Sequence, residues 1–249
     1  MFIDTHCHIS NEDYNDIDLV IKENRENNVD KMIISACTRD TLDEAIALSK
    51  KYNDLYLSLG YHPSEARKVS EDDFNYLKEV LKNDKVVAVG EIGLDYHYGK
   101  EDIIEQKELF EKQLQIAEEL KLPVVIHSRD AVEDTINILK KYHVVGDIHC
   151  FSGSLETARI YIKMGYKLGI GGVVTFKNSK LGDVVKEIGI ENILLETDAP
   201  YLAPEPYRGK INSSKYVTII AERIADILNI SIEKVAEETT KNAINLFDL

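Results

Sequence analysis

The chain has 249 residues, 44% of them hydrophobic, and a formal net charge of −14 at pH 7. A chain of this length buries a large core without disulfides, and its three cysteines (Cys7, Cys37 and Cys150) are an odd and widely spaced set that favours reduced thiols. The acidic charge argues against a broad electrostatic grip on a nucleic-acid backbone, although bound divalent cations would change the local field.

The first residues have neither the basic start nor the apolar run of a signal peptide. No stretch is apolar for the roughly 18 residues that a membrane span needs. Together with the cysteine count, these features predict a cytoplasmic protein with reduced thiols and without a membrane partner. Cys7 and Cys150 neighbour candidate ligands but face the other way by strand parity, so they are interpreted as packing residues.

Short apolar segments alternate with longer amphipathic ones along the chain. The apolar segments predict strands at Phe2–Thr5, Lys31–Cys37, Leu55–Leu59, Val86–Glu91, Val124–His127, Gly146–His149, Lys167–Gly171 and Ile193–Glu196. Most are rich in Val, Ile and Leu without polar alternation, which is typical of strands covered on both faces. The clearest helical pattern runs from Glu101 to Leu120, and Pro123 ends it before the next strand.

Eight such units, recurring about every 30 residues, predict an α/β fold of the (β/α)8 barrel type with parallel strands. A doubly wound open sheet is the alternative, since a sequence does not show closure of the sheet. No Gly-rich dinucleotide or P-loop motif follows a strand. The composition shows no break or linker, so residues 1–249 are predicted to form a single domain.

Potential metal ligands recur where the predicted strands end. In a barrel, the loops after the strands meet at one face, where catalytic residues gather. The candidates at these ends are His6, His8, Glu91, His127, His149 and Asp198. A single histidine at a strand end is commonly a hydrogen-bonded loop residue, but six nitrogen and oxygen ligands at matching positions predict a binuclear metal site.

Three carboxylates near these strand ends have distinct predicted roles. Glu91 closes an otherwise apolar strand, where an isolated charge would be costly, so a position bridging two cations would satisfy both of its oxygens. Asp4 and Glu196 each precede a ligand by two residues on the same face. They are predicted to orient ligand imidazoles, with simple core hydrogen bonding as the alternative.

Six motifs carry a resemblance to a known family: "DTHCH", "GYHP", "GEIGLDY", "HSRD", "HCFSG" and "ETDAPYL". In order and spacing they resemble the signatures of TatD-type metal-dependent deoxyribonucleases, which are (β/α)8 barrels of the amidohydrolase superfamily. The resemblance implies two divalent ions (Mg, Mn or Zn). One is held by His6 and His8 and the other by His127 and His149. Glu91 is shared between them, and Asp198 is the remaining ligand. It covers the whole chain. One departure is Ser214, where family members carry proline, and this leaves the conformation of the loop from Arg208 to Ser214 open.

The leading hypothesis is metal-assisted hydrolysis of DNA phosphodiester bonds, in the manner of a 3'-5' exonuclease acting on single strands or 3' ends. Asp198 is placed to orient the attacking hydroxide or to accept its proton, and Glu91 is the second candidate catalytic residue. Arg129, Arg208 and His62 are candidate phosphate contacts, with ordinary ion pairs or loop contacts as the alternative.

Two other activities and one non-catalytic role stay open. The same chemistry would hydrolyse a small amide, lactone or ester, for which an acidic protein is well suited. The resemblance also permits removal of D-amino acids from tRNA. The third possibility is a metal-binding protein without catalysis. No obligate protein partner is predicted.

Overall fold

The computed structural model describes residues 1–99 and 101–249. The strands are β1 (Phe2–Cys7), β2 (Val29–Ala36), β3 (Leu55–Leu59), β4 (Val86–Asp95), β5 (Val124–Arg129), β6 (Gly146–Ile148), β7 (Lys167–Ile170) and β8 (Ile193–Leu195). The helices are α1 (Ile17–Glu26), α2 (Arg39–Lys51), α3 (Glu71–Val80), α4 (Ile103–Leu120), α5 (Val132–Leu139), α6 (Leu155–Lys163), α7 (Leu181–Ile188), α8 (Val217–Leu228) and α9 (Ile232–Phe247). Short 3-10 turns are η1 (Pro63–Glu65), η2 (Gly172–Thr175), η3 (Ile190–Asn192) and η4 (Ser214–Tyr216).

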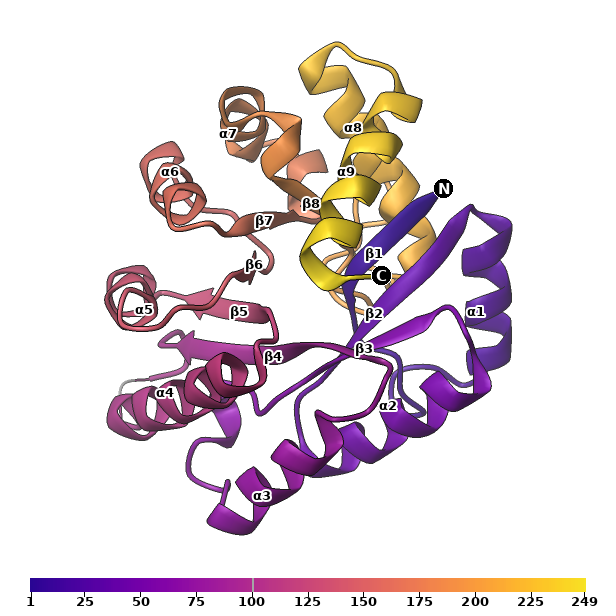
Figure 1. The fold of residues 1–249 in the computed structure, drawn as a ribbon. Helices are drawn as coiled ribbons and strands as arrows, with labels where there is room; N and C mark the ends of the chain where they lie inside the picture. Colours follow the sequence, from indigo (N-terminus) through magenta and orange to yellow (C-terminus); the bar gives the residue numbers. More distant parts are fainter. Residues whose placement is uncertain (100) are drawn as a thin grey trace. The chain divides into compact units, whose positions relative to one another are not determined.

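In the described residues, the eight strands form one sheet whose order follows the chain, from β1 to β8, and Figure 1 shows a helix after each strand. The pairs β1–β2, β3–β4, β4–β5, β5–β6 and β7–β8 are parallel. The first and last strands also meet, because Cys7 forms a parallel bridge with Ala199 and the Thr5 hydroxyl donates to Leu195 O. A doubly wound sheet departs from chain order. The connectivity therefore confirms the (β/α)8 barrel.

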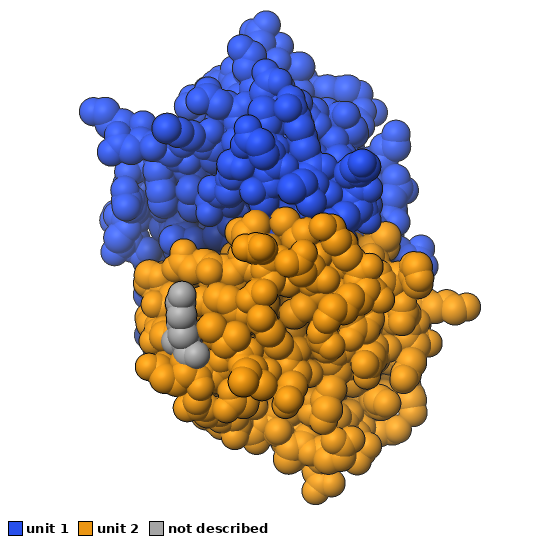
Figure 2. Space-filling model, turned by 90° about the vertical axis from the view of Figure 1, so that its left-hand side faces the viewer, with its two compact units in different colours: residues 1–34, 150–249 blue, residues 35–149 orange. Residues whose placement is uncertain are grey.

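The contacts divide the chain into two compact units, coloured separately in Figure 2. Unit 1 comprises residues 1–34 and 150–249, and unit 2 comprises residues 35–149. The prediction of a single domain stays a prediction. Each unit carries side chains that could hold a metal ion.

In unit 1, helices α8 and α9 pack against β1 and β8. Every residue of β1 is buried, which agrees with a strand covered on both faces. Polar side chains at the N-termini fix where the helices start: Asp16 caps α1, Ser154 caps α6 and Ser231 caps α9, each accepting a hydrogen bond from a backbone N–H of the first turn.

In unit 2, helix α4 packs against β4, and β4 pairs with β5. Helices α2 and α3 begin with capping boxes at Thr38 and Ser70, which satisfy backbone donors that would otherwise lack partners. All ten residues of β4 are buried.

Several predicted boundaries are wrong, and β4 shows the largest error. It runs to Asp95, four residues past the predicted end at Glu91. The strand continues because its register shifts between Val89 and Ile92, and the apolar residues after Glu91 stay paired with β5. The other errors are of one or two residues. Helix α4 begins at Ile103 rather than Glu101. Strands β1 and β5 end two residues late, β2 begins two residues early and ends one residue early, and β6, β7 and β8 end one residue early.

Where the structure describes the chain, no helix combines the length and the apolar character that crossing a bilayer demands. The cytoplasmic localisation stays a prediction. None of the three cysteines forms a disulfide in the described structure, in agreement with the expected reduced thiols, and the Cys7 thiol is buried and donates to Ile33 O.

Candidate metal-binding clusters

Unit 1 brings together His6, His8 and Asp198, which we call the paired-histidine cluster. His6 lies in β1, His8 follows that strand, and Asp198 lies in the loop after β8 with a φ of +56°. The Nε2 atoms of the two histidines are 3.3 Å apart. Oδ1 of Asp198 lies 3.7 Å from Nε2 of His6 and 3.5 Å from Nε2 of His8. Three potential ligand atoms therefore converge on one point.

These separations fit a bound cation. Ligand atoms at 2.0–2.1 Å from a tetrahedral ion lie about 3.3–3.4 Å from one another, and the three separations in the paired-histidine cluster fall at or just above this value. The two imidazoles of this donor set suit Zn²⁺. The carboxylate also suits Mn²⁺ and Mg²⁺, which prefer oxygen ligands to imidazoles. The residues present fit a divalent metal.

Asp4 joins the strand that carries His6 to the segment that carries Asp198. Its Oδ1 accepts from the backbone N–H of His6 (3.3 Å) and of Thr197 (2.9 Å), and its Oδ2 accepts from the Thr197 hydroxyl (2.6 Å). The N–H of Asp198 in turn donates to His6 O at 3.0 Å. Burial raises the pKa of Asp4 to about 7, because its effect is larger than that of the accepted hydrogen bonds, which lower the pKa.

Glu196 also binds backbone, because its Oε1 accepts from the N–H of Cys150 at 2.7 Å. Cys150 has a φ of +48°, so this carboxylate fixes an unusual backbone turn. Both Asp4 and Glu196 are completely buried. The structure gives them a role in holding the chain segments that carry ligands, while their predicted action on the imidazoles stays a prediction.

Unit 2 brings together Glu91, His127 and His149, which we call the glutamate cluster. One ligand atom from each lies within 4.8 Å of the others. Oε1 of Glu91 is 2.7 Å from Nδ1 of His127 and 3.7 Å from Nε2 of His149. The Cys37 thiol approaches the second oxygen, Oε2, at 3.8 Å. Glu91 and His149 are buried, so a charge here needs a partner, and a divalent cation would supply one.

Asp95 contacts the glutamate cluster and was missed by the sequence analysis. Its Oδ2 lies 3.2 Å from Nε2 of His127, on the side of the ring away from Glu91. Asp95 is itself held by Gln106, whose side-chain oxygen accepts from the Asp95 N–H and whose side-chain nitrogen donates to Asp95 O. The signal was the "GLD" that follows "GEI", but the strand was expected to have ended before it.

The two carboxylates set the charge of His127. Burial alone lowers the pKa of this imidazole, but hydrogen bonds to Asp95 and Glu91 outweigh that effect and raise the pKa to about 9. The pKa of Asp95 is lowered in return, because its hydrogen bonds to His127 and to the N–H of His97 outweigh burial. Without a metal, the glutamate cluster therefore holds a proton on His127 at neutral pH.

The candidate phosphate contacts lie beside the clusters or on aromatic rings. His62 precedes η1, and its ring centroid is 4.6 Å from that of His127. The Arg129 guanidinium lies 5.3 Å from the ring centroid of Tyr98, and that of Arg208 lies 4.4 Å from the ring centroid of Phe176. Neither arginine forms an ion pair with another described residue, but Arg129 makes a loop contact as the alternative expected, because its Nη1 donates to the Tyr98 hydroxyl at 3.4 Å. Their contact with substrate stays a prediction.

The six predicted ligands thus fall into two groups of three, one in each unit. Each group is brought together from distant parts of the chain, as expected for residues at strand ends. A common binuclear centre that joins the two groups stays a prediction.

Comparisons with known proteins agree with this arrangement. The family described as TatD related DNase matches residues 3–248. A metal-dependent hydrolase of Bacillus subtilis, YabD, is 42% identical over 252 residues, which are 99% of each chain. A metal-dependent hydrolase of Methanocaldococcus jannaschii is 34% identical over 251 residues, covering 99% of this chain and 96% of its own.

A solved structure extends the likeness to three dimensions. YjjV, a TatD homologue from Escherichia coli, superposes with a TM-score of 0.92 at 32% identity, covering 100% of this chain and 98% of its own. The match of strand order, ligand types and sequence over nearly all residues identifies the chain as a metal-dependent hydrolase that belongs to the TatD-related DNase family.

Proposed function

We propose that this hydrolase cleaves phosphodiester bonds of DNA, acting on single strands or 3' ends, with one divalent ion on each cluster. The observation that carries the proposal is the pair of donor sets, two histidines with Asp198 and two histidines with Glu91, in a chain of this family. Paired metals suit phosphodiester hydrolysis because both the attacking and the leaving oxygen need charge stabilisation.

Divalent ions, when bound, supply Lewis acidity and a water acidic enough to lose a proton near neutral pH. Asp198 is positioned to orient that water and to accept its proton, because its Oδ1 already lies among the other ligand atoms of its cluster. The loop after β8 holds this carboxylate in place through the hydrogen bond from the Asp198 N–H to His6 O.

His62 is suited to donate to a phosphate oxygen. The backbone N–H of Ser64 donates to its Nδ1 at 3.1 Å, which places the proton of the neutral ring on Nε2. Arg129 and Arg208 keep their guanidinium groups on aromatic rings rather than on carboxylates, so their charge is available to a phosphate.

A substrate panel tests the proposal. The full chain is incubated with single-stranded DNA, duplex DNA, bis(p-nitrophenyl) phosphate, N-acyl amino acids, a lactone and D-aminoacyl-tRNA, each with Mg²⁺, Mn²⁺ or Zn²⁺ and with chelator. We expect chelator-sensitive shortening of single-stranded DNA and release of nitrophenol. Activity on the amide, lactone or aminoacyl ester alone would replace the nuclease proposal, and metal binding without turnover of any substrate would overturn it.

The products separate the mode of attack. Cleavage from 3' ends releases mononucleotides from an oligonucleotide labelled at its 5' end and leaves a ladder of shortened, labelled chains. A circular single strand stays intact under the same conditions. Rapid linearisation of the circle would show internal cleavage and overturn the proposed preference for ends.

A further inference from the structure

The loop between β8 and α8 differs in charge from the rest of the chain. Residues 199–216 contain three basic side chains, Arg208, Lys210 and Lys215, and one acidic side chain, Glu205, in a protein whose net charge is −14. Lys215 forms an ion pair with Glu23, with its Nζ 2.6 Å from Oε2 of the carboxylate. Arg208 and Lys210 form no ion pair with any other residue that the structure describes. Two uncompensated cations therefore lie on one loop of an acidic protein.

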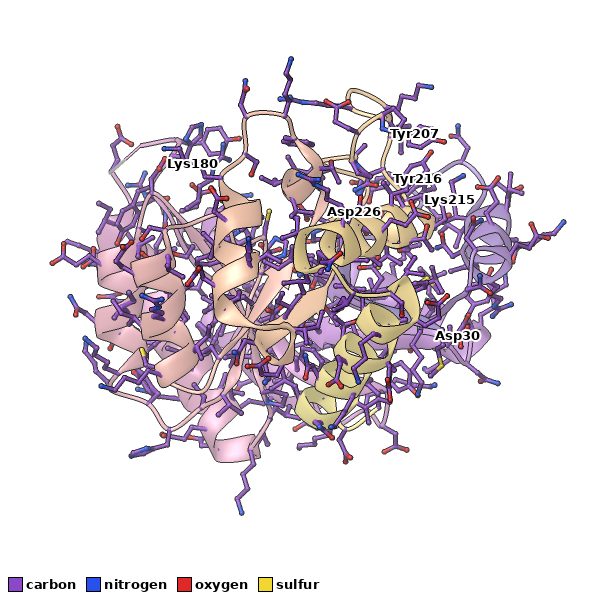
Figure 3. All side chains as sticks on the ribbon, turned by 90° about the horizontal axis from the view of Figure 1, so that it is seen from above. Asp30, Lys180, Tyr207, Lys215, Tyr216 and Asp226 are labelled. Carbon is purple, nitrogen blue, oxygen red and sulfur yellow. The ribbon has the colours of Figure 1, made fainter. Side chains whose placement is uncertain are left out.

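Aromatic rings lie among these charges. The Arg208 guanidinium lies over the ring of Phe176, 4.4 Å from its centroid. Tyr207 and Tyr216 stack with centroids 4.4 Å apart and planes 15° from parallel, and Figure 3 shows the two labelled close together. The ammonium of Lys210 lies over Tyr207 at 5.6 Å. Cations and aromatic rings alternate here, as they do on surfaces that bind single-stranded nucleic acid.

The same loop begins beside the paired-histidine cluster. Tyr201 is 57% exposed as a residue, and the centroid of its ring lies 5.8 Å from that of the His8 ring. Ile211, further along the loop, is 66% exposed. An exposed tyrosine thus adjoins a candidate metal ligand, and the cationic, aromatic part of the loop follows it in the chain. We call Tyr201, Tyr207, Arg208 and Lys210, with Phe176 beneath Arg208, the loop platform.

The backbone of the loop is anchored. Asn212 is completely buried, and its amide nitrogen donates to Thr197 O at 2.7 Å and to Tyr201 O at 2.6 Å. The N–H of Glu205 donates to the Thr175 hydroxyl at 2.9 Å, which ties the loop to η2. Because these bonds hold the loop, its side chains meet a ligand without a large loss of backbone entropy.

We propose that the loop platform is a binding surface for the part of a single-stranded nucleic acid that lies next to the scissile phosphate. Bases stack on the rings of Tyr201 and Tyr207, and Arg208 and Lys210 contact backbone phosphates. This inference rests on the proposed nuclease function and names the surface that would hold the single strand. A duplex hides the faces of its bases, so the platform favours single strands.

Binding of an uncleavable strand tests the platform directly. The full, Mg²⁺-loaded chain is titrated into a fluorescent phosphorothioate oligothymidylate of about twelve nucleotides, and anisotropy gives Kd. Tyr201→Ala is expected to raise Kd by roughly 5- to 160-fold, the range for loss of one stacked base, while Tyr201→Phe keeps it near that of the parent chain. Equal affinity of the parent and Tyr201→Ala chains, or no binding by the parent chain, would overturn the proposal.

The charged half of the platform has its own readout. The double variant Arg208→Ala with Lys210→Ala is expected to weaken binding and to reduce the slope of log Kd against log salt by about 1.4, since each phosphate contact contributes about 0.7 on single strands. Lys180→Ala is the control, because Figure 3 labels this exposed lysine far from Tyr207. An equal change of slope in the control would mean that only net charge matters, which contradicts the platform.

Turnover separates this inference from the proposed function. If Tyr201→Ala raises KM for single-stranded DNA but leaves hydrolysis of bis(p-nitrophenyl) phosphate unchanged, both proposals hold. If the parent chain binds the oligonucleotide with the expected variant effects but cleaves no phosphodiester, the platform stands and the nuclease proposal fails. If DNA is cleaved and the variants change neither Kd nor KM, the platform fails alone.

Discussion

The two metal-binding clusters differ in how their ligand atoms meet. In the paired-histidine cluster, nitrogens 3.3 Å apart face each other, and the carboxylate of Asp198 stays 3.5–3.7 Å from both. In the glutamate cluster, Glu91 contacts His127 at 2.7 Å, and Asp95 contacts the other nitrogen of the same ring at 3.2 Å.

This difference shows what each cluster does without a metal. Two carboxylates around His127 stabilise a proton on its ring, so the glutamate cluster carries its own substitute for a cation. The paired-histidine cluster has separations that match the ligand spacing around an ion. We therefore expect metal binding to compete with a proton in the glutamate cluster but not in the paired-histidine cluster.

The largest expected effect is loss of turnover from Asp198→Asn. The amide keeps the shape of the side chain but neither accepts a proton nor balances a cation, so kcat on the preferred substrate should fall by about 10²- to 10⁴-fold. Bound metal, measured after dialysis, should fall as well. Asp226→Asn, an exposed acid on α8 of the same unit, is the control and should match the parent chain. Near-normal turnover by Asp198→Asn would exclude it from the chemistry.

A second prediction concerns the strand pairing that holds His127. Gly93 pairs with His127 between β4 and β5 and has a φ of +147°, and a Cβ placed there would lie 1.9 Å from His127 O. Gly93→Ala combines backbone strain with a backbone clash and should lower the free energy of unfolding by about 3 kcal/mol or more.

Urea unfolding measures this loss. Gly171→Ala in unit 1 is the control, because its added Cβ would meet its nearest neighbour at an ordinary 3.5 Å. Equal stability of the two alanine variants would mean that β4 moves away from β5 without cost, and that the pairing does not position His127.

Much of both clusters was predictable because strand ends are marked in the sequence. A run of Val, Ile and Leu followed by histidine or an acid marks the end of a buried strand, and barrel connectivity then brings such ends to one face. His6, His127 and His149 were predictable on this basis. So was the order of the strands, since helical segments separate them at regular intervals.

Asp95 and the β8–α8 loop were not predictable, for physical reasons. A charged residue inside a buried strand is read as the end of that strand, but Glu91 is accommodated there by His127 and β4 continues beyond it. The loop depends on hydrogen bonds from Asn212 to residues more than ten positions away. No local sequence pattern encodes such contacts. A serine at position 214 also does not by itself specify the conformation of the β8–α8 loop.

Asp95→Asn separates orientation from charge in the glutamate cluster. The Asp95 carboxylate accepts from Nε2 of His127 and so leaves Nδ1, beside Glu91, as the nitrogen that binds a cation. Weakening this bond should lower metal affinity by about 10- to 100-fold when measured above the pKa of His127. Calorimetry measures the affinity. Asp130→Asn is the control, because Asp130 pairs with the exposed His97 in the same unit. Unchanged affinity in Asp95→Asn would assign Asp95 to folding alone.

The smallest effect per step, and the sharpest test of the contrast, is the pH dependence of metal binding. His127 must lose its proton before its nitrogen binds a cation, so the affinity of the glutamate cluster should rise about tenfold for each pH unit up to about 9 and then level off. Calorimetry in buffers of different ionisation enthalpy should detect one released proton. In the metal-free protein the sign is opposite: the stabilisation from protonated His127 is complete below its ordinary pKa of 6.5 and is lost as pH rises through about 9. His127→Gln should abolish both dependences, and a metal affinity that stays flat between these pH values would mean that no proton competes for the cluster.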